Sequence, residues 1–397
     1  MKNLTNPLLS IVVPTMNRYY HLVKLIEHID TFSNVDLELV IQDNTEDNHY
    51  ILDYLERKNR RFLVYRHTKE RLSISDNVDL AIGNSSGEYI CFIGDDDGVM
   101  PSIIECTKWM RDHEVDAAIF ANIIYNWPDY YSEVNTGTDT GALFYDNFSF
   151  KVNLLNPIHE LRKTAGSGFT NLHGLPKLYQ GIVSRKSVDA VYLIGKTYTP
   201  GPSPDMATAV ALAFIAKRFV KISIPVIITG QSANVGAGER KLAGRTKNLK
   251  EVDFISEVAK SNWSSLIPRV WCTQTVWPES AIKAIEYMGK SSEIKVSFAH
   301  ILARIVQNYP LEFLVAYKHS NNRLYFLILC GYFIIGRRAK KAYHFLRSVF
   351  NNLDHKSPLC NKKNGLNTLH DSALFIKENC PQFCEAGITD KLIIEKH

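Results

Sequence analysis

Three consecutive aspartates, Asp95, Asp96 and Asp97, directly follow the apolar run 89–93. Adjacent carboxylates repel one another unless a cation neutralises them. Because alternate residues of an extended backbone point the same way, Asp95 and Asp97 can converge on one side. Two carboxylates, together with phosphate oxygens and water, suit octahedral Mg²⁺ or Mn²⁺. The run therefore predicts a divalent-metal site, although a solvated acidic turn would also account for it.

Short apolar runs alternate with helix-like segments in the part of the chain that carries these aspartates. The runs cover 9–13, 37–41, 62–65, 89–93 and 117–120, and the helix-like segments cover 21–30, 48–58, 75–82 and 103–113. This alternation predicts an α/β fold with βαβ units around a mostly parallel sheet. Ligands of such sheets bind beyond the carboxyl ends of the strands, so residues 14–18, 43–44 and 94–97 are candidates for binding.

The periodicity fades between residues 126 and 177, where Gly, Asn, Tyr and Asp accumulate. A long stretch without regular structure inside a domain is typical of a functional insertion or lid. Regular patterns return as a strand at 181–183, a helix at 204–218 and a strand at 220–229.

The loop 230–250 then combines glycines with Arg240, Lys241, Arg245 and Lys247. It suits either a lid that closes over a diphosphate or an exposed connector. The remainder is expected to be mainly helical, and we place the domain boundary between residues 235 and 236.

Several segments match a known pattern in both order and spacing. They are 10–18 (SIVVPTMNR), 40–44 (VIQDN), 76–77, 86–90 (SGEYI), 94–97 (GDDD) and Pro101. Through about residue 125 the chain thus resembles the inverting GT-A glycosyltransferases of family 2, whose aspartates form a DxD motif. One departure is Gly94, which stands where many members carry the leading aspartate of Asp-x-Asp-Asp. Which aspartates bind metal therefore stays open; we favour Asp97, with Asp95 near the ribose or the metal.

The resemblance implies a GT-A, Rossmann-like domain over residues 1–235, with 126–177 as its acceptor-side insertion, and a helical region over 236–397. It also implies a nucleotide-sugar donor, with a UDP-sugar expected, whose diphosphate is held by Mn²⁺ or Mg²⁺. The metal ligands are then Asp95 and Asp97. The expected donor contacts are Pro14, Thr15, Asn17, Arg18, Asp43, Asn44, Arg71, Asn77, Asp95 and Asp96.

Simpler interpretations of these residues stay open. Arg18 and Arg71 can make charge-assisted contacts to phosphate or base, but a solvated surface role suits either one alone. Asp43, expected near the base, and Asn44 are also typical turn residues. We favour binding for this pair.

Inverting transfer needs a base that takes the proton of the acceptor hydroxyl. The resemblance implies an acidic residue at the start of a helix about 100 residues beyond the DxD aspartates, and Asp205 fits. An aspartate at this position would also simply cap the helix. Many relatives carry Glu-Asp where this chain has Pro204-Asp205. The alternatives for the base are Glu160 and Glu133.

The apolar segment 324–335 is followed by Arg337, Arg338, Lys340, Lys341 and Arg347. It is shorter than the roughly 20 residues that span a bilayer. An anionic membrane surface and burial in a helical domain explain it equally well. Seven cysteines without a pairing pattern favour free thiols and a cytoplasmic location, with peripheral contact to the inner face of the membrane. The net charge of +5 is too mild to predict binding to nucleic acid.

Together these observations predict a metal-dependent inverting glycosyltransferase of the hexosyl- or N-acetylhexosaminyltransferase class. The expected acceptor is a hydroxyl of a glycan or lipid-linked oligosaccharide in bacterial surface polysaccharide (O-antigen or capsule) synthesis. One alternative is transfer to a polyprenyl phosphate. Another is a non-catalytic nucleotide- or glycan-binding protein with the same fold, against which the intact aspartates argue.

Overall fold

The computed structural model describes residues 7–32, 36–130, 139–172, 174–233, 246–350, 361–384 and 387–395, with the backbone alone for 337–350. Its centre is a nine-stranded sheet in the order β16-β9-β11-β6-β10-β4-β1-β2-β3. Strands β1 (Leu9–Thr15), β2 (Leu37–Asp43), β3 (Leu63–His67) and β4 (Tyr89–Phe92) form its parallel half. In the other half, β10 (Ile182–Ser184) runs antiparallel between β4 and β6 (Ala117–Phe120). The sheet is completed by β11 (Phe219–Ile222), β9 (Lys151–Leu155) and β16 (Ile393–Glu395).

A five-stranded sheet adjoins the first, in the order β15-β8-β7-β12-β5. Its strands are β5 (Gly98–Val99), β7 (Ile123–Asn126), β8 (Ala142–Tyr145), β12 (Ile227–Gln231) and β15 (Asn361–Lys363). Because β5 directly follows the three aspartates and β12 pairs with it, the aspartates lie where the two sheets meet.

Helices cover the large sheet, and α1 (Tyr19–Ile29) shows why: it presents an apolar stripe to the core. In α1, Leu22, Leu25, Ile26 and Ile29 are fully or almost fully buried, as their helical spacing predicts. The other helices of this part are α2 (His49–Glu56), α3 (Ile74–Gly83), α4 (Ile103–Asp112), α5 (Pro157–Gly166), α6 (Arg185–Gly195) and α7 (Pro204–Ile215). The predicted α/β fold with a mostly parallel sheet is confirmed.

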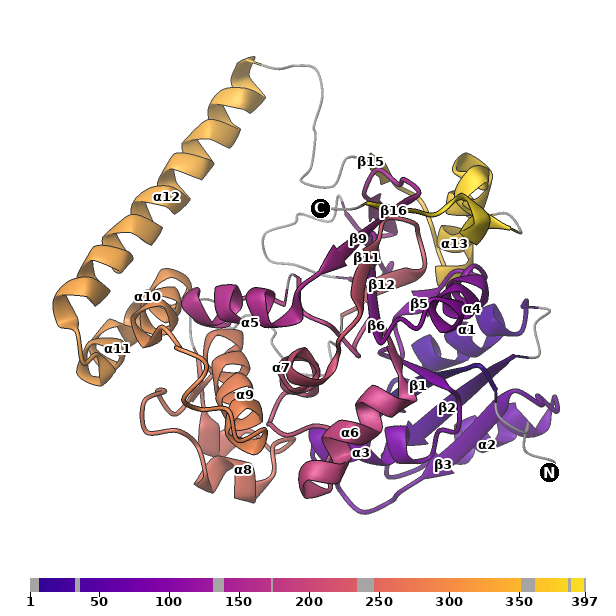
Figure 1. Cartoon of the computed structure of the whole chain (residues 1–397), viewed down its shortest axis with the longest axis horizontal. Coiled ribbons are helices and arrows are strands. Elements are labelled where there is room, and N and C mark those ends of the chain that lie inside the picture. The colour runs from indigo at the N-terminus through magenta and orange to yellow at the C-terminus, as the bar shows by residue number, and fades with distance from the viewer. Residues whose placement is uncertain are drawn as a thin grey trace.

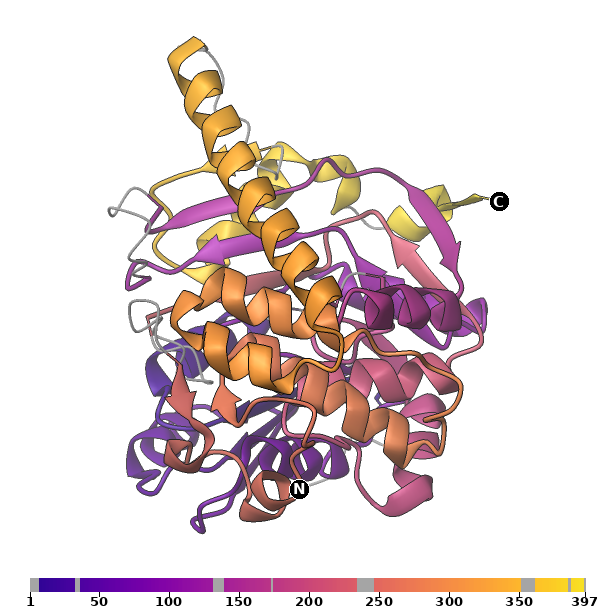
Figure 2. The ribbon, with the colours of Figure 1, turned by 90° about the vertical axis from the view of Figure 1, so that its left-hand side faces the viewer.

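The predicted helical region after residue 235 is also present. It contains α8 (Glu257–Ser261), α9 (Thr273–Tyr287), α10 (Phe298–Asn308), α11 (Phe313–His319) and α12 (Arg323–Phe350), with the short strands β13 (Lys247–Asn248) and β14 (Val270–Trp271). The far end of α12 projects away from the body of the protein (Figures 1 and 2). None of the helices in the described ranges combines the length and apolarity that crossing a bilayer requires.

Two expectations about organisation need correction. Residues 126–177 were expected to lack regular structure, yet they contain β8, β9 and α5. These strands have four or five residues, and β9 is partly exposed, so no clear alternation of polar and apolar residues marks them. After α12 the chain also returns to the sheets through β15 and β16, and α13 (Leu369–Asn379) packs against α1 (Figure 1). These last residues thus pack with the N-terminal part of the chain.

Candidate active site

The three aspartates form a buried acidic cluster between β4 and β5. Asp95, Asp96 and Asp97 are 3%, 5% and 0% exposed. Burying charges is costly unless each carboxylate has a partner. The contacts of each aspartate therefore indicate its role.

Arg18 provides the positive charge of this cluster. It precedes α1, and its Nη2 lies 2.8 Å from Oδ2 of Asp96 while its Nε lies 3.2 Å from Oδ1 of Asp95. Burial alone would lower the pKa of Arg18, but the two carboxylates raise it above its ordinary value. The cation that the aspartates require is thus supplied by the chain itself.

Asp95 and Asp96 each have one further polar partner. The hydroxyl of Thr15, at the end of β1, donates to Oδ2 of Asp95 at 2.6 Å. Burial raises the pKa of Asp95 to about 7, although Arg18 acts to lower it. Ser232 donates from Oγ to Oδ2 of Asp96 at 2.7 Å and also accepts from Nη2 of Arg18. A network from three distant segments thus holds both carboxylates.

Asp97 has different surroundings. Its Oδ1 accepts from the backbone N–H of Gly230 at 2.7 Å and from Nε2 of Gln180 at 3.0 Å, and its Oδ2 accepts from the N–H of Gly94 at 2.8 Å. Burial raises its pKa to about 7, with Asp96 adding to the effect. Oδ1 therefore links the loop to β12 and to the segment before β10, whereas Oδ2 makes a local contact within the loop. The preference for Asp97 as the metal ligand thus stays a prediction, and a metal there would have to compete with these donors.

Gly230 and Trp127 fit tightly around the backbone of Asp96. The indole N–H of Trp127 donates to the carbonyl oxygen of Asp96 at 2.9 Å. A Cβ at Gly230 would lie 1.7 Å from that same oxygen, so only glycine fits there. Gln180, Trp127 and Ser232 escaped the sequence analysis. They come from other elements, and only the glycine-rich start of the 230–250 loop gave a signal.

The residues after β1 lie beside the acidic cluster. Asn17 has a left-handed backbone (φ 59°), and its N–H donates to the Thr45 hydroxyl at 2.9 Å. Asn77 donates weakly to the carbonyl of Thr15 at 3.4 Å, and its buried Oδ1 has no hydrogen-bond donor within the described ranges. Pro14 pairs in register with Gln42 of β2.

A cavity of about 370 Å³ adjoins Arg18, and Asn17 and Asp129 also line it. The structure thus brings the predicted residues after β1 to the edge of an open space. Asn77, which lies next to Thr15, presents an unsatisfied oxygen close to the same strand end.

Asp43 is fully buried and its carboxylate is engaged by its neighbours. Oδ2 accepts from the hydroxyls of Tyr19 at 2.8 Å and Tyr65 at 2.7 Å, and Oδ1 accepts from the N–H of Thr45 at 2.9 Å. Burial and this carboxylate raise the pKa of both tyrosines above its ordinary value. Contact with a nucleobase, as predicted, requires Asp43 to exchange one of these partners.

Asn44 holds the loop that carries Arg71. Its Nδ2 donates to the carbonyls of Thr68 and Glu70, both at 2.7 Å, and its Oδ1 accepts from the N–H of Leu72 at 2.9 Å. The Arg71 side chain is 48% exposed and lies 3.4 Å from Asp253. Asn44 therefore positions a loop, and the Arg71 side chain that this loop carries contacts Asp253 and the Sδ atom of Met16 at the surface.

Asp205 lies at the start of α7, as predicted. Its Oδ1 accepts from the Met206 N–H at 2.8 Å and from the hydroxyl of Ser203. Burial raises the pKa of Asp205, while these contacts and one from Trp277 lower it. The contacts to Ser203 and Met206 also agree with a helix-capping role.

Tyr179 lies close to the acidic cluster, and the charge of Asp205 also acts on it. Burial raises the pKa of Tyr179 well above its ordinary value, and the charges of Asp97, Asp96 and Asp205 add to the effect. The alternative base Glu160 pairs instead with Lys163 at 3.6 Å on α5. Glu133 and most of the 230–250 loop, including Arg245, lie outside the described residues.

The donor atoms fit a divalent ion at Asp95 and Asp96 better than at Asp97. No cluster of three or more His, Cys, Asp or Glu side chains suited to a metal occurs in the described parts of the chain. However, Oδ1 of Asp95 is a buried oxygen without a hydrogen bond there. Carboxylate oxygens are the ligands that Mg²⁺ and Mn²⁺ prefer. Because Arg18 already pairs with these two carboxylates, a metal ion would either bind them together with the guanidinium group or displace it.

Comparisons with known proteins support the resemblance for the N-terminal part. Residues 10–165 match the family model of glycosyl transferase family 2. The glycosyltransferase GlyG of Streptococcus pneumoniae is 30% identical over 125 residues, which cover 31% of this chain and 40% of that protein. The GalNAc(5)-diNAcBac-PP-undecaprenol β-1,3-glucosyltransferase of Campylobacter jejuni is 27% identical over 120 residues, 30% of this chain and 38% of that protein. The match thus spans about two-fifths of these curated relatives.

Among solved structures, S. aureus TarS 1–349 in complex with UDP-GlcNAc aligns over 84% of this chain and 92% of that chain. Its sequence identity is 12% and its TM-score is 0.47. The acidic cluster and Arg18 lie inside the segment that matches the family, whereas Asp205 lies beyond it. Residues 10–165 of this chain are thus similar to glycosyl transferase family 2.

Proposed function

We propose that the protein is an inverting glycosyltransferase that takes a nucleoside-diphosphate sugar, with a UDP-sugar as the expected donor. The observation that carries the proposal is the buried acidic cluster with Arg18, at the carboxyl end of parallel strands and beside an open cavity. The match of residues 10–165 to the model of glycosyl transferase family 2 supports it.

Charge complementarity supports a diphosphate as the ligand. Arg18 and the half-exposed Arg71 are cations that can contact phosphate oxygens. Asp95 and Asp96 would hold Mn²⁺ or Mg²⁺, which supplies charge neutralisation to the departing nucleoside diphosphate. Asp97 positions its two neighbours through the contacts to Gly94 and Gly230.

Asp205 is our candidate for the base. A raised pKa makes a carboxylate a stronger proton acceptor, and burial raises that of Asp205. The proton of the acceptor hydroxyl would pass to its carboxylate as the oxygen attacks the anomeric carbon on the face opposite the diphosphate. Ser203 and Trp277 fix the carboxylate in place.

We also propose that the acceptor is a glycan or lipid-linked oligosaccharide of a bacterial surface polysaccharide, used at the inner face of the cytoplasmic membrane. The C. jejuni relative is named for glucosyl transfer to an undecaprenol-linked saccharide, which supports this acceptor class. One face of α12 also exposes Leu324, Ile328, Tyr332 and Ile335 by 72%, 59%, 69% and 67%. Exposed apolar and aromatic residues suit a membrane interface. The cations from Arg337 onwards belong to the part described by its backbone alone.

A donor screen tests the activity. The purified protein is incubated with a panel of nucleotide sugars in Mn²⁺, Mg²⁺ and EDTA, and release of the nucleoside diphosphate is measured. We expect release from a UDP-sugar, loss of it in Asp96→Asn, and no change in the control Asp112→Asn, an exposed residue on α4. Asp205→Asn is expected to lose transfer while it still binds UDP. A protein that binds nucleotides but turns over none of the donors would be the non-catalytic alternative.

Vesicle co-sedimentation tests the membrane surface. Vesicles with anionic lipid are expected to bind the protein, and Ile328→Glu with Tyr332→Glu is expected to reduce the bound fraction several-fold. The control is Leu193→Glu, because Leu193 is equally exposed (69%) on the distant helix α6. Equal loss in both proteins would contradict the assignment of this face.

A further inference from the structure

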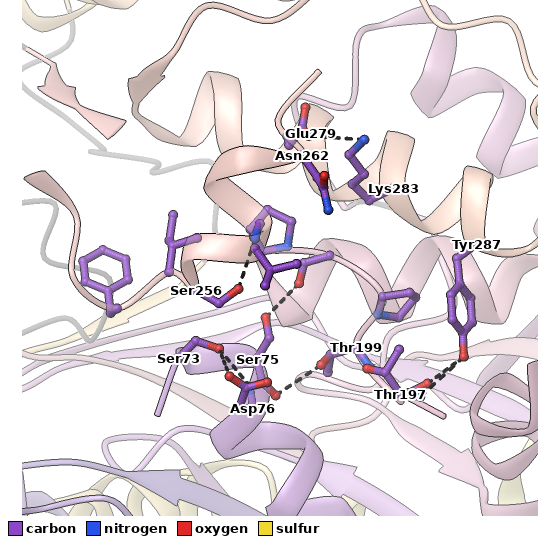
Figure 3. Close-up of a pocket in the computed structure, with 17 residues that line it drawn as sticks. Ser73, Ser75, Asp76, Thr197, Thr199, Ser256, Asn262, Glu279, Lys283 and Tyr287 are labelled. Atoms are coloured by element: carbon purple, nitrogen blue, oxygen red, sulfur yellow. Dashed lines mark hydrogen bonds and ion pairs between the residues drawn. The ribbon is translucent and has the colours of Figure 1, made fainter. Parts of the chain in front are cut away.

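A second cavity, of about 400 Å³, lies between the start of α3, the segment 197–202 and the helices α8 and α9 (Figure 3). Cavities of this size accommodate small ligands. Its walls come from both the family 2 segment and the helical region that follows residue 235. No residue of the candidate active site lines it.

Glu279 is the unusual residue of this cavity. It is 1% exposed; its Oε1 accepts from the N–H of Ser264 at 3.0 Å and lies 3.9 Å from Nζ of Lys283. Its Oε2 is buried and has no donor among the described residues. Leaving a buried carboxylate oxygen without a donor costs free energy, about 1–3 kcal/mol or more. A ligand that donates a hydrogen bond here would recover that cost.

The charged residues that line the cavity limit the chemical class of ligand that it can bind. Glu279 and Asp76 are acidic, and Lys283 is the basic residue of the lining. A phosphate would face two carboxylates against one ammonium group, which disfavours it. Burial raises the pKa of Glu279 to about 7, so near neutral pH its carboxyl group can both accept and donate.

The neutral part of the lining combines apolar and polar side chains. The apolar ones are Pro200, Pro202, Phe254, Ile255, Val258 and Ala259, and those with hydroxyl or amide groups are Ser73, Ser75, Thr197, Thr199, Ser256, Asn262 and Tyr287. In Figure 3, Glu279, Asn262 and Lys283 gather at one end of the cavity, and Ser73, Ser75 and Asp76 at the other. Donors and acceptors beside apolar side chains and the rings of Phe254 and Tyr287 suit a neutral polyhydroxylated ligand, because each sugar hydroxyl both donates and accepts while the sugar ring also has apolar C–H faces.

The cavity shares a wall with the candidate base. Gly201 and Pro202 line it, and the N–H of Ser203 donates to Oγ of Ser280 on α9 at 2.8 Å. Asp205 follows two residues later and is contacted by Trp277, which also belongs to α9. One helix therefore carries the cavity residues Glu279 and Lys283 together with the contacts that fix the base.

We propose that this cavity binds a neutral sugar unit of the acceptor. The inference rests on the proposed transferase activity and assigns a role in acceptor binding to the helical region. Hydrogen bonds from the sugar to Glu279, Asn262 and Lys283 hold the acceptor beside the segment that leads to Asp205.

Saturation-transfer NMR tests the site with simple probes: the methyl glycosides of glucose, galactose, N-acetylglucosamine and N-acetylgalactosamine, and glucose 1-phosphate. The full chain is compared with Glu279→Gln, Lys283→Met and the control Glu293→Gln, which changes an exposed residue paired with Lys290. At least one methyl glycoside is expected to bind to the wild type. Its saturation-transfer signal should be at least five-fold weaker with both cavity variants. The control should keep the wild-type signal.

UDP affinity, measured by calorimetry on the same proteins, separates this proposal from the proposed function. It is expected to change less than two-fold in the cavity variants. The inference is overturned if no methyl glycoside binds, if both cavity variants bind it like the wild type, or if glucose 1-phosphate binds more tightly than the neutral sugars. If the protein neither binds UDP nor turns over any donor, while a methyl glycoside binds and loses its signal in Glu279→Gln, the transferase proposal is wrong and the sugar site is still supported. If Glu279→Gln does not fold, Lys283→Met still tests whether the cavity binds the sugar.

Discussion

The Nη2 atom of Arg18 lies 2.8 Å from Oδ2 of Asp96, although 78 positions separate the two residues in the sequence. The contact arises because β1 and β4 are adjacent and parallel, so the loops that follow them meet at one edge of the sheet. With Asp95 on its other side, Arg18 allows the acidic cluster to be buried in the free protein. Stability and ligand binding are therefore expected to depend on the same residue.

Arg18→Gln is expected to destabilise the protein in EDTA. Removing one partner of a buried ion pair leaves uncompensated charge, which costs about 3–5 kcal/mol. Because Asp95 and Asp96 then lack a cation, Mn²⁺ should restore part of the loss. Urea unfolding with and without Mn²⁺ measures both effects. The control Arg111→Gln removes a largely exposed pair with Asp112 and should cost less than about 1 kcal/mol. Wild-type stability of Arg18→Gln in EDTA would contradict this account of the cluster.

Asp97→Asn and Asp96→Asn are expected to separate positioning from binding. In Asp97→Asn, an amide N–H must face one of the backbone donors Gly94 and Gly230, so one hydrogen bond is replaced by repulsion. We expect a loss of about 1–3 kcal/mol in the free energy of unfolding, independent of Mn²⁺. Asp96→Asn should instead lose donor turnover, and any change in its stability should come from the weakened pair with Arg18. If Asp97→Asn were as stable as the wild type but had lost metal-dependent turnover, the metal role would return to Asp97.

Gly230→Ala is expected to disrupt the junction of the two sheets. The added Cβ would lie 1.7 Å from the carbonyl oxygen of Asp96, so β12 must move away and the N–H contact to Asp97 is lost. We expect destabilisation of more than about 3 kcal/mol, in the range of severe core defects. Gly83→Ala is the matched control, because nothing lies within 4 Å of its Cβ position in α3. There, alanine should stabilise by about 0.5–1 kcal/mol. Thermal unfolding of the two variants and the wild type measures these changes in stability.

Much of the acidic cluster could be predicted because its signals are local. The strands β1 and β4 are fully or mostly buried, and the residues at or just beyond their carboxyl ends, Thr15 and Asp95, do meet. The remaining contacts depend on pairing that leaves no local pattern. Gln180 reaches Asp97 because the segment before the short antiparallel strand β10 runs beside β4. No periodicity reveals such a contact.

Polar surroundings were harder to predict than strand positions. Asp43 lies at the carboxyl end of β2, but two tyrosines donate hydrogen bonds to its carboxylate, and one of them comes from β3. Asn44 likewise uses its amide to hold a loop. Asx residues after a strand serve structure as readily as binding, and only tertiary contacts separate the two roles.

Glu279 is expected to make stability depend on pH in an unusual direction. Burial raises its pKa from 4.5 to about 7. Between these values the folded protein binds more protons than the unfolded chain, so this residue makes the protein more stable as pH falls from about 7 to 4.5. Above pH 7 the carboxyl group of Glu279 is charged in the folded protein, so the full cost of burying this charge is subtracted from the free energy of unfolding. Glu279→Gln carries no such charge, so the stability difference between wild type and variant should change by about 3 kcal/mol over this range.

Urea unfolding at pH 8, 7, 6 and 5 measures this difference, and subtracting the variant's curve removes the titration of other groups. Glu293→Gln should give a flat difference, because Glu293 is exposed and paired with Lys290 on the surface. Parallel curves for the wild type and Glu279→Gln would mean that the carboxyl group is solvated. A solvated group would have no unsatisfied oxygen to offer a sugar, so this measurement also bears on the proposed acceptor site.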